Sequence, residues 1–274
     1  MLPHAIGVGP ARAATTWLWQ CLKDHPDVCW SVDKKTDFFD LYYDRGLAWY
    51  EEHFAHCPPG KVVCELTETY LFYDEVPARI RACVPEAKIF TCLRNPVDRA
   101  LSAYLHLKRE GIGDLSFEQA MDRFGKALVD DSLYYDHLKP YFELFPRERI
   151  HVCFFERIPE NPLGFIQTLY AFLGVDPTHV PAMLDQKLNP TRPPRFWLLN
   201  RMMRQGNWLL RDLGLLGLRA RLKESTMVQK LYFGAYAQGP PALDIEKRAR
   251  LWDIFRPQVQ GLETLLGQDL SFWR

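Results

Sequence analysis

Short apolar runs and amphipathic stretches alternate along the chain up to about residue 185. The runs predict buried strands at residues 5–8, 28–32, 61–65, 88–93 and 150–155, of which 88–93 (KIFTCL) is the clearest. Apolar positions at helical spacing predict helices at residues 15–23, 76–83, 97–109, 134–145 and 162–173. Because strands and helices alternate, the pattern predicts an α/β fold with a central parallel sheet and helices on both of its faces.

The pattern changes after residue 187. Arg and Trp become frequent, apolar residues recur at helical spacing, and no strand pattern appears before the closing amphipathic helix and tail. We expect one domain over residues 1–274 with a helical C-terminal cover. Residues 196–222 are interpreted as a lid over an apolar acceptor, with a dimer surface and a lipid-touching amphipathic face as alternatives.

Composition narrows the class of protein. The 274 residues are 47% hydrophobic and 25% charged, as in globular proteins, and 34 basic residues balance 34 acidic ones. No overall positive field is therefore available to recruit nucleic acid. The first residues are not a basic stretch followed by a long apolar core, and no apolar run reaches ~18 residues, so we expect neither a secretory signal nor a transmembrane segment. The seven cysteines form no C-x-x-C pair, so we expect no zinc site. Their odd number without a secretory signal predicts buried thiols in a reducing cytoplasm.

The stretch GPARAATTWLWQ, residues 9–20, joins a predicted strand to a predicted helix. A helix N-terminus offers unpaired N–H groups and the positive end of its dipole to an anion. Ala13 and Ala14 let an anion approach the backbone, Thr15 and Thr16 offer hydroxyls and a helix cap, and Arg12 adds a permanent charge. A plain turn with a threonine cap and a solvent-facing arginine is the alternative. The lysine that a triphosphatase loop needs immediately before its Ser/Thr is absent.

A second cluster follows the clearest strand, in CLRNPVDRALSAYLH. Arg94 ends the strand, Ser102 and His106 lie four residues apart on the next helix, and Arg99 is near in sequence. Two strand ends that each present an arginine and hydroxyls suit a nucleoside with an anionic group at either end, bound at the carboxyl edge of the sheet. A capped helix with exposed arginines is the alternative.

The pair GPARAATTWL and LRNPVDRALSAY resembles the two cofactor loops of sulfotransferases that use 3′-phosphoadenosine 5′-phosphosulfate (PAPS). The nearer branch is that of the heparan-sulfate N- and O-sulfotransferases and their soluble bacterial relatives. Further matches extend the resemblance along the chain in the same order. They are HPDV, KKTDFFD, GLAWYEEHF, ELTETY, SLYYDHLKPYFELFPRERIHVCFFE and LETLLGQDLSFW. It implies a P-loop-like three-layer sandwich and in-line sulfuryl transfer from PAPS to a hydroxyl or amine of a carbohydrate or secondary metabolite. It also implies no need for a metal and leaves a homodimer open.

The resemblance also implies roles for individual residues. The residues expected to grip the 5′-phosphosulfate are Arg12, Ala13, Ala14, Thr15, Thr16 and Trp17. Arg94 and Ser102 would hold the 3′-phosphate, and Tyr134 would approach the adenosine. Arg192 and Arg195, in TRPPR, would supply a late loop that closes over the cofactor.

The base that takes the acceptor proton is the open question in this reading. The family pattern is Lys-Glu followed two residues later by Phe-Phe, with the Glu as base, but Lys35 stands at the Glu position here. In an extended segment Asp33, Lys35 and Asp37 would share a face, so Asp37 is one substitute. His106 is the other, because imidazole titrates near neutrality. The alternatives are that Asp37 is a surface turn residue and that His106 is packed.

Charge that develops on the bridging oxygen would be met by Arg12, assisted by Lys34 or Lys35. Glu65 and Tyr70 in ELTETY align with a family segment that faces the acceptor, although Leu66 replaces the usual lysine. The aromatics Tyr42, Tyr43, Trp49 and Tyr50 are interpreted as core and rim residues, with an acceptor wall as the alternative.

Two further functions stay open. The lysine at position 35 is compatible with a nucleotide-binding protein that has little transferase activity. A P-loop kinase is the other alternative. It is disfavoured by the missing loop lysine.

Overall fold

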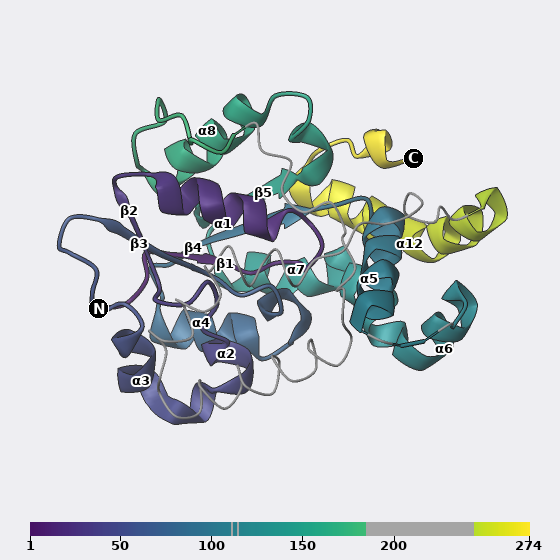
Figure 1. The fold of residues 1–274 in the computed structure, drawn as a ribbon, viewed down its shortest axis with the longest axis horizontal. Coiled ribbons are helices and arrows are strands. Elements are labelled where there is room, and N and C mark those ends of the chain that lie inside the picture. The colour runs from purple at the N-terminus through teal and green to yellow at the C-terminus, as the bar shows by residue number, and fades with distance from the viewer. Residues whose placement is uncertain (111, 114, 185–243) are drawn as a thin grey trace.

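The computed structural model describes residues 1–184 and 244–274, apart from 111 and 114 (Figure 1). Arg192, Arg195 and the interpreted lid at residues 196–222 therefore lie outside the described residues.

Five parallel strands form the central sheet in the spatial order β2-β3-β1-β4-β5. The strands are β1 (Ala5–Gly7), β2 (Val28–Trp30), β3 (Val62–Leu66), β4 (Lys88–Leu93) and β5 (Ile150–Phe154). In the register of the central strand, Ile6 lies opposite Glu65 on one side and Ile89 on the other. Since all strands run the same way, their carboxyl ends and the loops that follow meet at one edge of the sheet.

Nine helices of the described residues connect and cover these strands. They are α1 (Thr15–Asp24), α2 (Phe38–Leu41), α3 (Gly46–Glu52), α4 (Val76–Cys83), α5 (Pro96–Glu110), α6 (Phe117–Leu128), α7 (Tyr134–Leu144), α8 (Pro162–Leu173) and α12 (Ile245–Leu266). Short 3₁₀ turns lie between several of them, the last at Ser271–Trp273.

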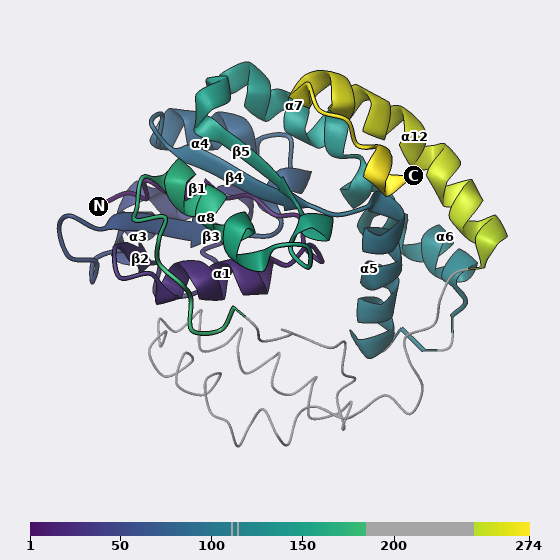
Figure 2. The same cartoon turned by 90° about the horizontal axis from the view of Figure 1, so that it is seen from above.

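Both faces of the sheet are covered by helices (Figures 1 and 2). Ile6 and Ile89 belong to the apolar cluster shared with α4 and α7, whereas Ala5 and Phe90 belong to the cluster shared with α1 and α8. Successive strand residues point to opposite faces, and both are buried, which explains why the strands read as continuous apolar runs. The predicted α/β sandwich with helices on both faces is confirmed.

The C-terminal helix α12 packs along the molecule beside α7 and α5 (Figure 2). Val259 and Leu262 join the core cluster that contains Leu138 of α7, and Leu251 and Phe255 join the cluster that contains α5 and α6. The predicted amphipathic closing helix is confirmed.

The predicted strands and helices agree with the structure to within two residues at each end. The segment between β2 and α2 does not. We expected it to be extended, but the chain bends over residues 32–34, and Asp37 has a left-handed backbone with φ of 50°. Helices α2, α3 and α6 were not predicted from the pattern.

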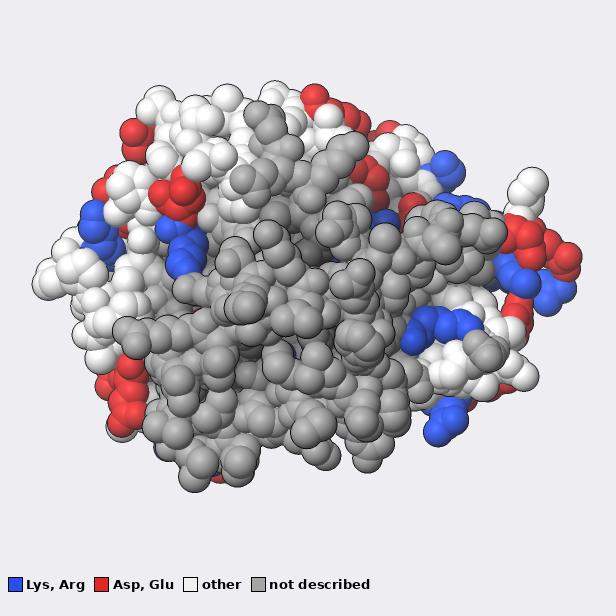
Figure 3. Space-filling view, viewed as in Figure 1, with Lys and Arg blue, Asp and Glu red and all other residues white. Residues whose placement is uncertain are grey.

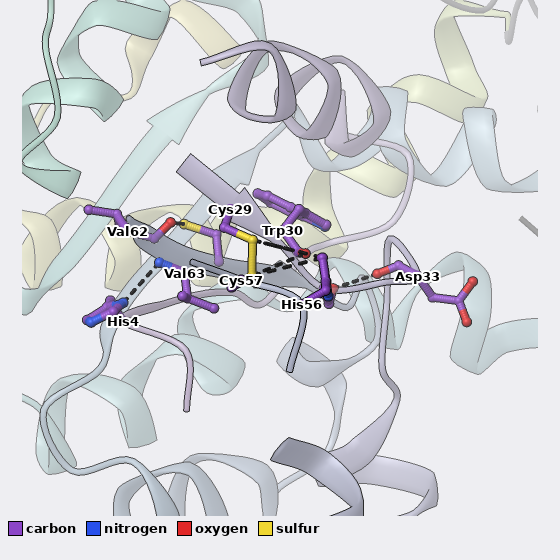
Figure 4. Close-up of a disulfide and its surroundings, with 10 residues drawn as sticks. His4, Cys29, Trp30, Asp33, His56, Cys57, Val62 and Val63 are labelled. Carbon is purple, nitrogen blue, oxygen red and sulfur yellow. Dashed lines mark hydrogen bonds between the residues drawn. A yellow bond between two sulfur atoms is a disulfide. The ribbon is translucent and has the colours of Figure 1, made fainter. Parts of the chain in front are cut away.

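A disulfide joins Cys29 of β2 to Cys57, which follows α3 (Figure 4). The expectation of thiols is therefore wrong for these two residues, and the other five cysteines are free. The two Cα atoms lie 5.7 Å apart although 28 positions separate the residues, because the chain after α3 returns alongside β2. His56 Nε2 lies 3.9 and 4.0 Å from the two sulfurs.

Acidic and basic side chains are mixed over the described surface visible in Figure 3. In the described part of the chain, no helix combines the length and apolarity needed to cross a bilayer.

Candidate functional site

The candidate site lies at the carboxyl edge of the sheet. The loop after β1 contains Arg12 and leads into α1, and Arg94 directly follows β4. On the other side, Lys34 follows β2 and Glu68 follows β3. Because β3 and β4 flank β1, four strand ends deliver these side chains to one region.

The loop after β1 has an unusual backbone. Gly9 has φ of 109°, and a Cβ there would lie 2.3 Å from the carbonyl oxygen of Glu68, so this close approach requires glycine. Arg12 and Ala14, two residues apart, have φ of 76° and 58°. Such left-handed residues are costly outside glycine, and their N–H groups can converge into an anion-binding nest.

The start of α1 corrects one expectation. Thr15 and Thr16 are the first helical residues and do not cap the helix; Ala14 occupies the N-cap position and has no capping side chain. The first-turn N–H groups of α1 are therefore left for a ligand or solvent rather than for a side-chain cap.

On the β4 side of the loop lies a group of four residues that we call the arginine end: Arg12, Arg94, Ser102 and Tyr134. Arg94 Nη1 donates to the carbonyl of Arg12 (3.2 Å), and Arg12 Nε donates to Ser102 Oγ (3.3 Å). The Tyr134 hydroxyl donates to the carbonyl of Arg94 (2.9 Å). The structure thus brings together the predicted cofactor residues of both loops.

The Arg94 guanidinium is held in place by its neighbours, but not all of its N–H groups have hydrogen-bond partners among the described residues. It lies 4.5 Å from the centre of the Phe155 ring, and its buried Nε has no hydrogen-bond partner among the described residues. A buried guanidinium donor without a partner fits an anionic ligand. Burial raises the pKa of Tyr134, so its hydroxyl stays a donor.

Arg99 belongs to the core and not to the site. It is 1% exposed and donates to Ser132 Oγ and to the carbonyls of Ala127 and Leu128. Its proximity to Arg94 in sequence does not make it a ligand-binding residue.

On the β3 side lies the second group, the carboxylate end: Thr15, Thr16, Lys34 and Glu68. Lys34 Nζ lies 2.5 Å from Glu68 Oε1 and 3.4 Å from each threonine Oγ1. The Thr15 hydroxyl also donates to Glu68 Oε1 at 3.4 Å. Lys34 thus connects the first two residues of α1, Thr15 and Thr16, to the carboxylate of Glu68.

Glu68 was missed by the sequence reasoning, although its segment ELTETY was singled out. Burial raises the pKa of this carboxyl, but the charges of Lys34 and Lys35 outweigh burial, and its pKa lies below the ordinary value. Glu68 is therefore ionised at neutral pH. A charged residue just beyond a buried strand was the available signal.

The two predicted substitutes for the missing glutamate differ in burial. Asp37 is 3% exposed and lies 3.4 Å from Lys35, so the interpretation as a surface turn residue is wrong. Its N–H donates to Thr67 Oγ1. His106 is half-buried on α5, one turn beyond Ser102.

Glu65 and Tyr70 are fully buried, so the expectation that they face an acceptor is wrong. Glu65 accepts hydrogen bonds from the hydroxyls of Tyr50 (2.6 Å) and Thr36 (2.7 Å), and the Thr36 and Tyr70 hydroxyls lie 2.9 Å apart. Burial raises the pKa of Glu65 to about 7, although the two hydroxyl donors lower it. Tyr50 is a core residue, as interpreted from sequence.

Two other features of the described residues lie outside this site. A hollow of about 650 Å³ between β5, α8 and residues 268–272 contains none of the site residues named above. Cys29, His56 and Cys57 place sulfur and nitrogen atoms within 4.8 Å of one another, but the two sulfurs are bonded to each other.

Fold and site together define an α/β protein with a loop of left-handed residues and an uncapped helix start after its central strand, and with an arginine at the neighbouring strand end. The chain belongs to the sulfotransferase family, since the family profile described as "Sulfotransferase domain" matches residues 2–190.

The chain is also similar in sequence and in structure to known sulfotransferases. Human heparan sulfate glucosamine 3-O-sulfotransferase 6 is 33% identical over 180 residues, which are 63% of this chain and 52% of the relative. The chain thus spans about half the length of the curated relatives it matches. A sulfotransferase from Alicyclobacillus acidocaldarius has a TM-score of 0.73 at 25% identity, covering 100% of this chain and 99% of its own. A mouse sulfotransferase complexed with PAP has the same fold (TM-score 0.54, 16% identity, 94% and 84% covered).

Proposed function

We propose that this protein transfers a sulfuryl group from PAPS to a hydroxyl or amine. The observation that carries the proposal is the convergence of Arg12, Arg94 and Ser102 beside a loop with left-handed residues at the carboxyl edge of the sheet. Membership of the sulfotransferase family supports it. The proposal treats residues 1–274 as one domain.

The two ends of the site suit the two ends of the donor. The arginine end offers the half-buried guanidinium of Arg94, whose buried Nε–H has no partner among the described residues, for the 3′-phosphate. The loop after β1, the two threonine hydroxyls and Lys34 suit the 5′-phosphosulfate. The mouse sulfotransferase complexed with PAP supports a donor of this class. Trp17, which is 6% exposed and packs against Phe165, would support the loop from the core.

Chemistry would occur at the carboxylate end. By analogy with phosphoryl transfer, catalysis consists of positioning and of charge stabilisation. Lys34, whose ammonium group already contacts both threonines, is the cation best placed to meet charge on the bridging oxygen. Arg12 would assist from the arginine end. Lys35 is directed to Asp37 instead.

A glycan or a small secondary metabolite is the proposed acceptor, and the named heparan sulfate relatives favour a glycan. No nucleic acid is part of this proposal, and a homodimer stays a prediction. The cytoplasm also stays a prediction. Its support from the cysteines is reduced, because Cys29 and Cys57 form a disulfide and disulfides persist mainly in oxidising compartments.

The test is a calorimetric titration with PAP, adenosine 3′,5′-bisphosphate, on the wild type and Arg94→Ala. Loss of a charge-assisted hydrogen bond costs about 1.5–3 kcal/mol, so we expect the affinity to fall roughly 10- to 150-fold. Arg149→Ala is the matched control, because Arg149 is half-buried like Arg94 but pairs with Glu86 before the amino ends of β4 and β5, away from the site. At 100 times its Kd, PAP should add about 2.7 kcal/mol to the stability of the wild type.

Absence of PAP binding by the wild type would contradict the proposal. Preferential binding of ATP with magnesium would favour the kinase alternative. Tight PAP binding without sulfuryl transfer to any member of a glycan and small-alcohol panel would favour the nucleotide-binding alternative.

A further inference from the structure

A carboxylate stands where an anion is expected to bind. Glu68 Oε1 lies 2.5 Å from Lys34 Nζ and 3.4 Å from Thr15 Oγ1, at the first residue of α1. A negative charge this close to an anion site repels a phosphosulfate and lowers its affinity. Its presence therefore calls for a role other than donor binding.

We propose that Glu68 is the catalytic base, which takes the proton from the acceptor hydroxyl or amine. The inference rests on the proposed sulfuryl transfer. Where family resemblance places a glutamate after β2, this chain has Lys35, and a glutamate stands instead after the neighbouring strand β3. A carboxylate is thus present at the adjacent strand end, where it contacts Lys34.

The backbone holds Glu68 against the loop. The N–H of Thr67 donates to Gly7 O (3.0 Å) and the N–H of Leu71 donates to Val8 O (2.9 Å), so the segment is tied to β1 on both sides of Glu68. The carbonyl of Glu68 packs against Gly9. The side chain is 23% exposed, which leaves the carboxylate enclosed but within reach of an acceptor. A base held on a rigid support meets the positional demand of proton transfer.

The two other candidates are placed less well. The Asp37 side chain is 3% exposed and lies against Lys35. His106 belongs to the helix of Ser102, whose hydroxyl accepts from Arg12 at the arginine end. Among the described residues, Glu68 is the carboxylate with a direct contact to Thr15, where the sulfuryl end of the donor is proposed to lie.

Lys34 links the strength of this base to donor binding. Its ammonium group is shared between Glu68 and the two threonines. A negatively charged donor beside the threonines competes for the ammonium group and adds negative charge near the carboxylate. Both effects raise the affinity of Glu68 for a proton. The carboxylate is thus a weak base before the donor binds and a stronger one afterwards.

The bond changes balance without a further reactant. A lone pair of the acceptor oxygen or nitrogen forms a bond to sulfur, and its proton passes to a Glu68 carboxylate oxygen. The bond between sulfur and the bridging phosphate oxygen breaks, and its electron pair leaves with adenosine 3′,5′-bisphosphate. Glu68 then releases its proton to solvent.

The experiment compares Glu68→Gln with Glu68→Asp and with the control Glu75→Gln. Glu75 is an exposed residue that pairs with Arg79 at the start of α4. Transfer from ³⁵S-labelled PAPS to a panel of desulfated heparan oligosaccharides and small alcohols is measured beside PAP affinity. We expect kcat to fall roughly 10²- to 10⁴-fold in Glu68→Gln, with PAP affinity unchanged or increased, because the neutral amide cannot take a proton. Glu68→Asp should recover part of kcat, and Glu75→Gln should be unaffected.

A pH profile separates a base from a residue that only holds Lys34. The acid limb of activity is assigned to the Glu68 carboxyl, whose pKa is lowered by the nearby charges of Lys34 and Lys35. The acid limb of kcat/KM in the wild type should therefore disappear in Glu68→Gln. If Glu68→Gln keeps this acid limb and its kcat stays within threefold of the wild type, Glu68 is not the base, although the proposed sulfuryl transfer still stands. A wild type that binds PAP yet transfers to no acceptor would overturn the proposed function, and the assignment with it.

Discussion

The two ends of the candidate site are built on opposite principles. The arginine end combines two guanidinium groups with a serine and a tyrosine, and its charges do not change near neutral pH. The carboxylate end pairs a lysine with a glutamate within 2.5 Å, so an incoming charge can redistribute the existing ones. The first end is suited to holding a ligand, and the second is suited to moving a proton.

This division follows from the sheet. The two arginines of the arginine end come from the loops after β1 and β4, with Ser102 on α5 and Tyr134 on α7. Lys34 and Glu68 come from the loops after β2 and β3. The loop after β1 and the start of α1 lie between the two groups: Arg12 of the loop contacts Ser102, and Thr15 of α1 contacts Glu68. Variants on the two sides should therefore separate binding from turnover.

After Glu68→Gln, Lys34→Met is expected to give the largest effect on the carboxylate end. It removes the cation shared by Glu68, Thr15 and Thr16, so kcat/KM should fall roughly 10²- to 10³-fold. Most of the loss should appear in kcat, the reverse of Arg94→Ala. Steady-state kinetics and PAP titration check this.

Lys35→Met is the matched control for Lys34→Met. Lys35 is 40% exposed and pairs with Asp37, not with the threonines, so its loss should change kcat/KM less than tenfold. Equal effects of the two lysine variants, or equal losses of kcat and PAP affinity in Lys34→Met, would contradict the division of the site into an end that binds the ligand and an end that moves a proton.

Most of the fold could be predicted from sequence because the sheet is buried on both faces. Strands such as β4 then read as continuous apolar runs, and helices α4 and α8 have the predicted bounds. The missed α6 begins with a capping box of Ser116 and Gln119, a local signal that was readable. The short helices α2 and α3 lie in an aromatic segment without a clear period, where packing decides the structure.

The arginine end could also be predicted, because arginines after buried strands must meet at the carboxyl edge of a parallel sheet. The carboxylate end could not. It depends on the lateral neighbours β2 and β3, whose order in the sheet is not encoded in any single segment. The disulfide between Cys29 and Cys57 was missed for the same reason, since no short-range spacing reveals it. Family resemblance directed attention to position 35 and away from position 68.

Glu65→Gln tests the core behind the carboxylate end. Burial raises the pKa of Glu65 from 4.5 to about 7. Between pH 4.5 and 7 the carboxyl is therefore protonated in the folded state and ionised in the unfolded state. The free energy of unfolding of the wild type should therefore fall by about 3 kcal/mol as pH rises from 4.5 to 7, and Glu65→Gln should lack this part. Burial raises the pKa of Tyr134, so the arginine end should not respond in this range.

Urea unfolding at pH 5 and pH 8 measures the Glu65 effect, with the exposed Glu75→Gln as the control. The amide can still accept from Tyr50 and donate to the Thr36 hydroxyl, so Glu65→Gln should fold. A stability difference between the variant and the wild type that is the same at both pH values would mean that Glu65 is ionised throughout the range.

Ser102→Ala is expected to give the smallest effect, and it sharpens the description of the arginine end. The hydroxyl accepts one hydrogen bond from Arg12 Nε at 3.3 Å and so orients this guanidinium, while Arg94 contacts the backbone carbonyl of Arg12. One hydrogen bond of this kind is worth about 1 kcal/mol, so PAP affinity should fall roughly fivefold while kcat stays within twofold. Ser116→Ala is the matched control, because it removes a helix cap of α6 and should lower stability without changing PAP affinity. A larger fall in kcat than in PAP affinity would mean that Ser102 acts in sulfuryl transfer. It would contradict the assignment of binding to the arginine end and of turnover to the carboxylate end.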